Sequence, residues 1–140
     1  MRVCQRVMCA AASGLAALCM TVAICAASES SQFRTPSGKI GCGYSNNTLR
    51  CDVDGGIKPL PPQPKSCEFD WGQGFWLSPK GPASIVCAGD TARNTSSPVV
   101  RYGTTWRRPS FACSSSPNGL RCTNADHHGF FISKGEAYRF

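Results

Sequence analysis

The stretch Ile40-Gly-Cys-Gly-Tyr-Ser-Asn-Asn-Thr-Leu-Arg-Cys51 decides the fold that the sequence predicts. A second stretch, Phe111-Ala-Cys-Ser-Ser-Ser-Pro-Asn-Gly-Leu-Arg-Cys122, has the same spacing between its cysteines and ends on the same Leu-Arg-Cys tripeptide. Alternate side chains of a β-strand share a face, so pairing the two cysteines of a stretch gathers its apolar residues on one side. Each stretch therefore predicts a β-hairpin closed by its own disulfide, which stabilises by roughly 2.5–3 kcal/mol on the chain-entropy argument.

The two hairpins need different turns. In the first, the pairing places Asn46 and Asn47 at the tip, and asparagine tolerates the left-handed backbone of a tight two-residue turn. In the second, the tip falls between Pro117 and Asn118, where the proline ring excludes a positive φ. Residues 116–119 fit a type I turn instead, with proline second and glycine fourth. The same register therefore suits both stretches.

A second pattern follows each hairpin. Gly74-Phe-Trp-Leu-Ser-Pro-Lys-Gly-Pro-Ala83 resembles Gly129-Phe-Phe-Ile-Ser-Lys-Gly-Glu-Ala137, and both predict an aromatic strand followed by a glycine turn. The repeated order suggests two related halves, at about 33–91 and 102–140; a chance recurrence of short strand motifs is the competing interpretation. Because each aromatic strand is apolar on both faces, it either lies between two layers or leaves one face for a partner.

The first 27 residues have the three parts of a secretory signal. Two arginines without an acid are followed by an apolar run to Ala27, and small residues precede Ser28. We expect cleavage there, which leaves a single domain at 28–140 that is secreted, periplasmic or associated with the cell envelope. The run is also long enough to span a bilayer, so an uncleaved signal that anchors the chain in the membrane is the alternative. Residues 28–140 hold 13 Lys and Arg against 8 Asp and Glu, a net charge of +5.

Four of the ten cysteines lie in the signal, and six remain. An even number in an exported chain predicts disulfides, because an oxidising compartment lets them persist. With the two hairpins closed, Cys67 and Cys87 are left to pair; six cysteines allow 15 pairings, and only the hairpin geometry favours this one. Zinc binding is disfavoured because no C-x2-C pair occurs among the six.

Short strands separated by glycine and proline, with no apolar pattern of helical period after the signal, predict an all-β domain. We expect a small disulfide-stabilised sandwich or barrel-like fold built from the two hairpin halves. The residues expected in its core are Phe33, Ile40, Tyr44, Leu49, Val53, Trp71, Phe75, Leu77, Ile85, Phe111, Leu120, Phe130, Ile132 and Tyr138. One segment breaks the pattern: Lys58–Lys65 has four prolines in eight residues and predicts a stiff, extended loop.

An ordered set of short motifs runs through almost the whole of residues 28–140: Phe33-x-Thr-Pro-Ser-Gly-x-Ile-x-Cys42, Leu49-Arg-Cys-Asp52, Asp70-Trp-Gly72, Val86-Cys-Ala-Gly-Asp-Thr91, Tyr102-Gly103, Gly119-Leu-x-Cys-x-Asn124, and His128-Gly-Phe130 with Ser133. The set resembles a family of small exported, cysteine-rich bacterial proteins, mainly actinobacterial, known only as a domain of unknown function. The resemblance implies an exported, cysteine-paired domain and supplies no catalytic residues.

The segment Val100–Pro109 is the best candidate for a ligand-binding surface. It contains Arg101, Tyr102, Trp106, Arg107 and Arg108 and no acid, and arginine beside aromatic rings grips anionic polymers by charge and stacking. Export disfavours nucleic acid as the ligand, so an anionic envelope polymer or a protein is the expected partner. The alternative is an exposed linker between the halves with Trp106 in the core.

Three further sites are weaker. Asp126-His127-His128 offers metal ligands, but His127 and His128 are adjacent in sequence and no third histidine exists, so a polar turn is the preferred interpretation. Asp90 is an isolated acid that suits a turn. The two arginines that recur before a cysteine, Arg50 and Arg121, alternate away from the cysteine face and are expected in solvent.

The sequence contains no recognised catalytic pattern, and we do not expect an enzyme. The acids are scattered, no G-x-S-x-G elbow occurs, and disulfide-bonded cysteines are not nucleophiles. We expect no cofactor and a non-catalytic binding or envelope-associated module. The alternatives are a secreted inhibitor that acts through the loop Leu60–Lys65, since a stiff loop loses little entropy on binding, and a small secreted hydrolase.

Overall fold

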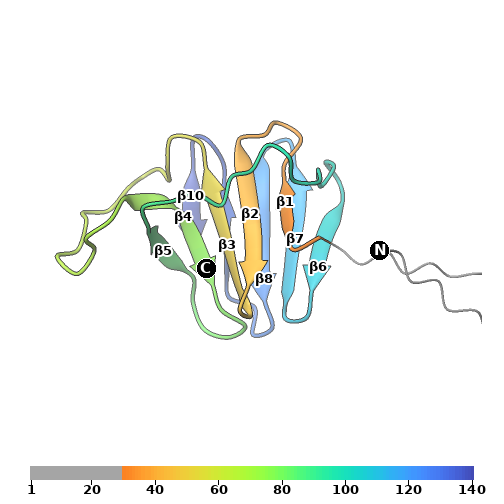
Figure 1. Cartoon of the computed structure of the whole chain (residues 1–140). Helices are drawn as coiled ribbons and strands as arrows, with labels where there is room; N and C mark the ends of the chain where they lie inside the picture. Colours follow the sequence, from red (N-terminus) through yellow and green to blue (C-terminus); the bar gives the residue numbers. More distant parts are fainter. Residues whose placement is uncertain (1–29) are drawn as a thin grey trace, which may run out of the picture.

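The computed structural model describes residues 30–140, which contain ten antiparallel strands and no helix (Figure 1). The signal expected at 1–27 lies outside the described residues. Sheet A consists of β1 (Gln32–Arg34), β2 (Ile40–Ser45), β3 (Thr48–Val53), β4 (Trp71–Leu77) and β5 (Ser84–Cys87), in that order. Sheet B consists of β6 (Thr105–Arg108), β7 (Phe111–Ser116), β8 (Gly119–Asn124), β9 (Gly129–Ile132) and β10 (Ala137–Arg139).

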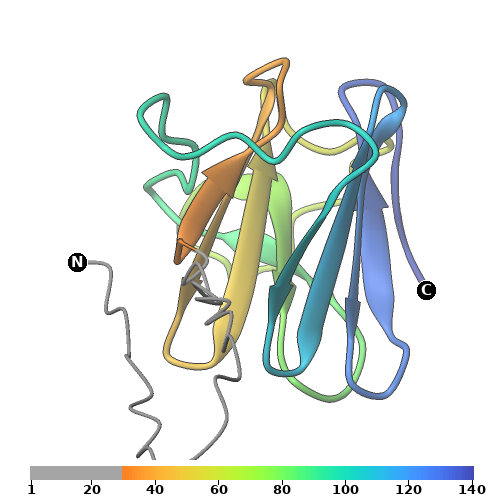
Figure 2. The ribbon, with the colours of Figure 1, turned by 90° about the vertical axis from the view of Figure 1, so that its right-hand side faces the viewer.

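The sheets pack face to face as the two layers of a sandwich (Figure 2). Each sheet is a meander of consecutive strands, and hydrogen-bonded strand pairs stay within a sheet, so the sheets do not close into a barrel. The all-β, disulfide-stabilised fold expected from the sequence is confirmed. Sheet A comes from the first predicted half of the chain and sheet B from the second.

Both hairpins have the register that the sequence predicts. Cys42 pairs with Cys51 across β2 and β3, and Cys113 pairs with Cys122 across β7 and β8. Each pair forms a disulfide, with a Cα–Cα distance of 4.1 Å, and a third bridge joins Cys67 to Cys87. These are the three pairs that the sequence analysis expects. The first turn has positive φ at both asparagines, 48° and 58°, as a tight two-residue turn requires.

The two sheets also match beyond their hairpins. Cys51 lies opposite Phe75 in sheet A, and Cys122 lies opposite Phe130 in sheet B. On the other side of the hairpin, Phe33 lies opposite Cys42, as Trp106 lies opposite Cys113. The sequence also contains part of this match: Phe33-Arg-Thr-Pro-Ser37 and Trp106-Arg-Arg-Pro-Ser110 both begin with an aromatic residue and an arginine and end with Pro-Ser.

The core is one cluster that spans both layers. Equivalent rings meet across it: Phe33 lies 4.7 Å from Trp106 and Phe75 lies 5.2 Å from Phe130, measured between ring centroids. Ten of the residues expected in the core are buried, namely Phe33, Ile40, Leu49, Val53, Phe75, Leu77, Phe111, Leu120, Phe130 and Ile132. Tyr44, Trp71 and Ile85 are half-buried. Tyr138 was wrongly expected there: it is 45% exposed, because it points outward from edge strand β10.

A long connection, residues 88–104, covers the outer face of sheet A on its way to β6 (Figure 1). We call it the strap. It pairs with the edge of β1 through a parallel bridge between Arg34 and Val99. Further along sheet A it packs so closely that a methyl group on Gly41 would lie 2.7 Å from the Cα of Arg93.

The strap overturns one expectation. Arg50 does alternate away from the cysteines, as predicted, yet its side chain is buried rather than solvated because the strap closes over it. Its guanidinium forms two hydrogen bonds to Asp52, at 2.9 and 2.8 Å, and one to the carboxylate of Asp90 at 2.7 Å.

Candidate ligand-binding face

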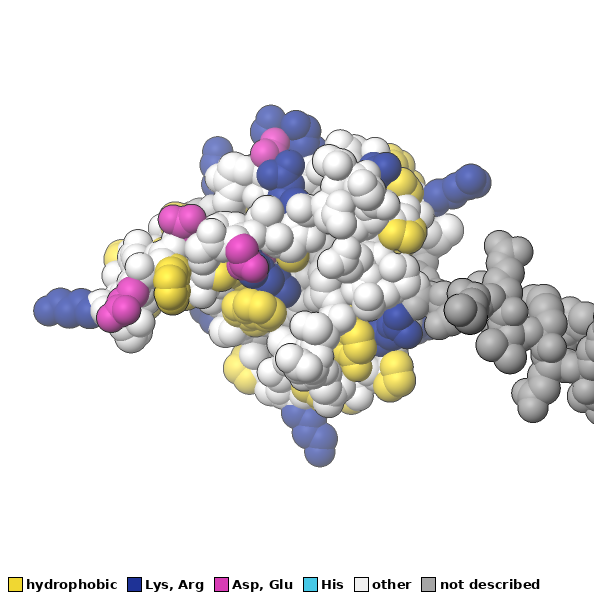
Figure 3. Space-filling model, in the orientation of Figure 1, with side chains coloured by type: hydrophobic (Ala, Val, Ile, Leu, Met, Phe, Trp, Pro, Cys, Tyr) yellow, Lys and Arg dark blue, Asp and Glu magenta, His cyan; other side chains and the backbone are white. Residues whose placement is uncertain are grey.

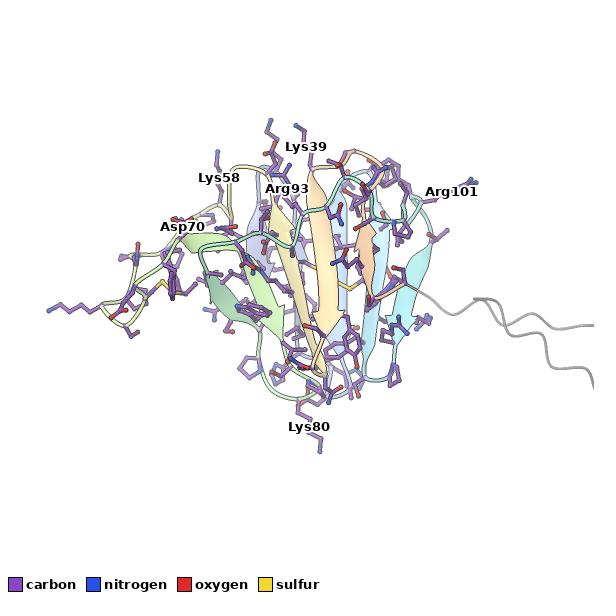
Figure 4. The ribbon with its side chains drawn as sticks, in the orientation of Figure 1. Lys39, Lys58, Asp70, Lys80, Arg93 and Arg101 are labelled. Atoms are coloured by element: carbon purple, nitrogen blue, oxygen red, sulfur yellow. A yellow bond between two sulfur atoms is a disulfide. The ribbon has the colours of Figure 1, made fainter. Side chains whose placement is uncertain are left out.

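The predicted basic and aromatic surface is divided by the fold. Arg101 and Tyr102 are exposed on the strap just before β6, and Arg101 points away from the sandwich in Figure 4. Arg107 is exposed on β6, whereas Arg108 lies against the rings of Tyr44 and Trp106, 5.7 and 6.0 Å from their centroids. The five residues therefore do not form one continuous surface.

Trp106 belongs to the core rather than to a ligand-binding surface. It is 3% exposed, its ring is tilted by 32° against that of Phe33, and its indole N–H donates a hydrogen bond to the carbonyl of Ser30 at 3.0 Å. The alternative interpretation of this residue, a tryptophan packed in the core, describes its position. The segment around it is the edge strand β6 and not a linker. Alternation along this strand turns the ring of Trp106 toward the core.

The histidine cluster lies in the turn between β8 and β9. His127 is exposed with a positive φ of 69°, and His128 is half-buried. The carboxylate of Asp126 accepts a hydrogen bond from the backbone N–H of Gly81, at 2.9 Å, and this bond lowers the pKa of Asp126 below its ordinary value. Within residues 30–140, one group of three metal-ligand side chains lies close together, and it consists of the disulfide-bonded Cys51, Cys113 and Cys122.

The outer face of sheet B is the surface that the fold leaves open. Its strands alternate so that the cysteines and leucine face the core and the intervening residues face outward. One row of cross-strand neighbours runs over this face: Thr105, Ser114, Arg121, Phe131 and Tyr138. A second row consists of Arg107, Ala112, Thr123 and Gly129. Two arginines and no acid therefore occupy the outward positions of these rows.

Aromatic side chains surround the central arginine of this face. The guanidinium of Arg121 lies 3.6 Å from the ring centroid of Phe140, which covers Gly129. Phe131 and Tyr138 stack on each other with centroids 5.3 Å apart and ring planes 25° apart. None of the ion pairs within residues 30–140 includes Arg121, and its side chain is exposed, as the sequence predicts. We call Arg121, Phe131, Tyr138 and Phe140 the open face.

Sheet A has an equivalent face, but there the strap covers the arginine. Arg50 occupies the position of Arg121 and Trp76 that of Phe131, and the guanidinium lies 5.1 Å from the indole centroid. Here the strap covers the arginine and supplies Asp90, whose pKa is lowered by the hydrogen bond from Arg50 and by its charge. Burial lowers the pKa of Arg50, but the bonds to Asp52 and Asp90 outweigh this and raise it. Acidic and basic side chains accordingly lie side by side on the surface in Figure 3.

An apolar groove lies beside the open face. The groove has a volume of about 730 Å³ and runs between the edges of β5 and β10 and the proline-rich loop, and Tyr138 and Phe140 form part of its wall. Its other lining residues are mostly apolar: Ile57, Pro59, Leu60, Pro61, Phe75, Pro82, Ile85, His128, Ala137 and Arg139. The groove extends the apolar surface of the open face around the edge of the sandwich.

The proline-rich loop projects from the β4 and β5 side of the molecule (Figure 1). Residues 58–66 are all exposed, as expected for a stiff surface loop, and the bridge from Cys67 to Cys87 anchors the end of this segment. The backbone N–H of Ala137 donates to the carbonyl of Lys58 at 2.7 Å, so the other end is held against β10.

Sequence reasoning found only part of this site. It identified Arg121 as recurrent and the Phe130–Ile132 strand as apolar on both faces, and these were the available signals. It did not assign Phe131, Tyr138 and Phe140 to one surface, because their grouping depends on the pairing of β8, β9 and β10.

No helix among residues 30–140 meets the length and hydropathy needed to cross a bilayer. Comparison with known proteins found no match among curated proteins or solved structures. A family model described as "Family of unknown function (DUF6636)" does match, over residues 12–140. The match covers nearly all of the chain and includes every strand and all three bridges. The protein therefore belongs to the DUF6636 family of unknown function.

Proposed function

We propose that this protein is an exported, non-catalytic binding module and that the open face is its ligand-binding surface. The observation that carries the proposal is the unequal treatment of two equivalent sheet faces. The strap buries Arg50 of sheet A, which is 6% exposed, whereas the equivalent Arg121 of sheet B is exposed and Tyr138 on the same face is 45% exposed. Exposed aromatic side chains grouped around an arginine are typical of binding surfaces.

The disulfides and the form of the N-terminal segment support export, and the pairing of two acids with an arginine supports the absence of catalysis. Three disulfides persist in oxidising compartments, and the apolar segment ending at Ala27 has the form of a secretory signal. Asp52 and Asp90, the acids brought together around Arg50, have their charges paired by its guanidinium. A general acid or base needs a carboxylate free to exchange a proton with substrate.

Export and oxidation are tested by the intact mass of the protein recovered outside the cytoplasm. We expect the mass of residues 28–140, and a gain of two hydrogens per bridge on reduction, six in all for three bridges. A mass that still includes the first 27 residues would point to an anchored chain. A mass that reduction leaves unchanged would contradict the disulfide-based argument for export.

Binding is tested by capture on immobilised protein. The oxidised chain is presented with cell-envelope fractions and, separately, with secreted proteins, and the retained material is compared between Arg121→Gln and Arg101→Gln. Both variants remove one exposed positive charge, but only the first alters the open face. We expect Arg121→Gln alone to lose retention. Equal retention by the wild type and both variants would remove the open face from the proposal.

A second candidate function is inhibition of a protein partner through the loop Leu60–Lys65. The observation that favours it is the exposure of the whole loop between two attachment points, the hydrogen bond to Lys58 and the bridge at Cys67. Such a loop is partly ordered before binding. Replacing Gln63 and Lys65 by alanine would then abolish capture of a protein partner, while the Arg121→Gln variant would retain it.

A further inference from the structure

The contacts that the strap makes with sheet A serve as a template for a ligand on the equivalent face of sheet B. Arg50 and Arg121 are equivalent in register, each flanked by an aromatic residue on the next strand. On sheet A the strap crosses that arginine where its backbone bends at residues 89–90. It gives the guanidinium the carboxylate of Asp90 and the main-chain carbonyl of the same residue, at 2.7 and 2.6 Å.

The strap also contacts the second outward arginine of sheet A. The Nε of Arg34 donates to the carbonyl of Ser97 at 3.1 Å, and Arg34 occupies the register position that Arg107 occupies in sheet B. One segment of the strap thus contacts both arginines of this face, one through a carboxylate and a carbonyl and the other through a carbonyl, with a turn at residues 95–96 between the two contacts. The equivalent spacing of two arginines is repeated on sheet B.

Sheet B lacks the acid that its sheet A counterpart carries. Asp52 accepts two hydrogen bonds from Arg50 and a third from the backbone of Ala92, and the equivalent position in sheet B is Thr123. Within residues 30–140, no carboxylate pairs with Arg121. An anionic ligand therefore complements the charge that Arg121 presents on this face.

The arrangement of the rings favours a peptide over a sugar. A saccharide ring stacks on an aromatic face that lies open and parallel to the surface. Phe131 and Tyr138 instead turn their faces toward each other, and the ring of Phe140 is in contact with the guanidinium of Arg121. These rings form an apolar surface on the β9 and β10 side of Arg121, and this combination suits a carboxylate side chain with apolar residues next to it.

From these observations, and resting on the proposed function, we propose that the open face binds an acidic segment of a partner protein. A glutamate or aspartate of that segment pairs with Arg121 as Asp90 pairs with Arg50, and its flanking residues pack on Phe131 and Tyr138. A charge-assisted hydrogen bond of this kind is among the stronger polar contacts, and Arg–carboxylate pairs are frequently bidentate.

The test is a titration of the oxidised, exported protein, followed by residue-resolved NMR at physiological ionic strength. The probes are a hexaglutamate peptide, a hexaglutamine peptide as the neutral control, and tetragalacturonate as an acidic saccharide. We expect hexaglutamate to shift the signals of Arg121, Phe131 and Tyr138, and hexaglutamine to leave them in place. Arg121→Gln should weaken the binding roughly tenfold or more, since a bond to a charged group is lost.

The matched control is Arg101→Gln, which removes the same charge from an exposed position outside the open face and should bind like the wild type. Equal weakening in both variants, or shifts spread over the whole basic surface, would reduce the effect to net charge and overturn the proposal. Shifts at Arg121 with tetragalacturonate alone would overturn the peptide and leave the binding module standing. An absence of shifts with every probe would overturn the acidic-peptide proposal, and capture from envelope or secreted fractions would still test the module separately.

Discussion

The burial of Arg50 beneath the strap depends on Asp52. Its carboxylate is 1% exposed and accepts hydrogen bonds from Arg50, from the hydroxyl of Thr91 and from the backbone of Ala92. It thus joins β3 to the strap, and Asp90 adds a second link through the same guanidinium. Removal of one partner of a buried ion pair leaves an uncompensated charge, which costs more than the pair contributes.

We therefore predict that Asp52→Ala lowers the free energy of unfolding by about 3–5 kcal/mol. Chemical denaturation of the oxidised protein measures this change. The matched variant is Asp54→Ala, two residues along the chain, where the carboxylate forms exposed ion pairs with Lys39 and Arg93. That variant should unfold almost like the wild type, and equal losses in the two variants would contradict the role given to Asp52.

The pH dependence of stability follows from Asp90. Its pKa lies below the ordinary value of 3.8 because Arg50 donates a hydrogen bond to it and carries a positive charge. The unfolded chain then binds a proton more readily, so the stability from this group is complete above the unfolded pKa and is lost as the pH falls through the folded pKa. We predict a flat Tm from neutral pH to about 5 and a fall below about 4.

The Asp90→Asn variant isolates this contribution. It should have a lower Tm than the wild type at neutral pH and a smaller fall in acid, measured by thermal unfolding across the same pH range. Parallel curves for the two proteins would place the acid sensitivity elsewhere, at Asp54 or Asp126, whose pKa values are also lowered.

Single residues also mark the limit of prediction from sequence. Alternation correctly placed Arg50 and Arg121 on the face opposite the cysteines, but local spacing could not predict whether another segment covers them. Arg50 is buried because Asp90, 40 residues away in the chain, is brought over it by the strap. Tyr138 was expected in the core and is exposed, whereas Trp106, for which a surface and a core position were both open, is buried. The pairing of each edge strand with its neighbour decides which of its side chains face the core.

At the scale of elements, the strands β4 and β9 approach their hairpins at a glycine. A methyl group on Gly74 would lie 1.8 Å from the carbonyl oxygen of Cys51, and one on Gly129 would lie 2.0 Å from that of Cys122. These glycines are the first residues of the repeated aromatic pattern. Their recurrence reflects the same close contact of an aromatic strand with the strand that carries the second cysteine.

We predict that Gly74→Ala and Gly129→Ala each destabilise the protein by about 3 kcal/mol or more, because the strands must separate to admit the methyl group. Gly43→Ala is the control, since no atom lies within 4 Å of its added methyl group, and it should change the stability by less than about 0.5 kcal/mol. Denaturant midpoints compare the three variants. A tolerated Gly129→Ala would mean that sheet B is looser than sheet A at this point.

The elements that the sequence predicts well are those stabilised by near neighbours. Both hairpins, their turns and their bridges depend on residues within about a dozen positions, and spacing alone placed them. The strand β6 depends on its pairing with β7, and the path of the strap depends on its contact with β1. Composition alone predicted an exposed segment at Val100–Pro109. The open face was missed for the same reason.

At the scale of the whole molecule, neither sheet has a core of its own. The buried face of each sheet consists of cysteine, leucine and aromatic side chains, and the aromatic contacts between Phe33 and Trp106 and between Phe75 and Phe130 cross from one layer to the other. A single sheet would expose this face to water. That the two halves descend from a duplicated unit stays a prediction, to which the equal registers and the parallel Pro-Ser segments are favourable.

We predict that residues 28–100 and 101–140, produced separately, do not fold. The second piece is near the size of about 40 residues below which a chain rarely forms a stable core alone. Dispersion of the amide NMR signals and near-ultraviolet circular dichroism measure the outcome, and mixing the oxidised pieces should restore both. A folded second piece would mean that its hairpin bridge and its outer aromatic side chains suffice without sheet A.

Two of the outermost strands share their hydrogen-bonding groups with loops of the same chain. Backbone atoms of Arg34 on β1 bond to Pro98 and Val100, and the N–H of Ala137 on β10 bonds to Lys58. An unoccupied strand margin invites a neighbouring copy to add its own strand and begin a fibril. The domain therefore carries its own protection against self-assembly at these two margins, whatever the concentration of copies around it.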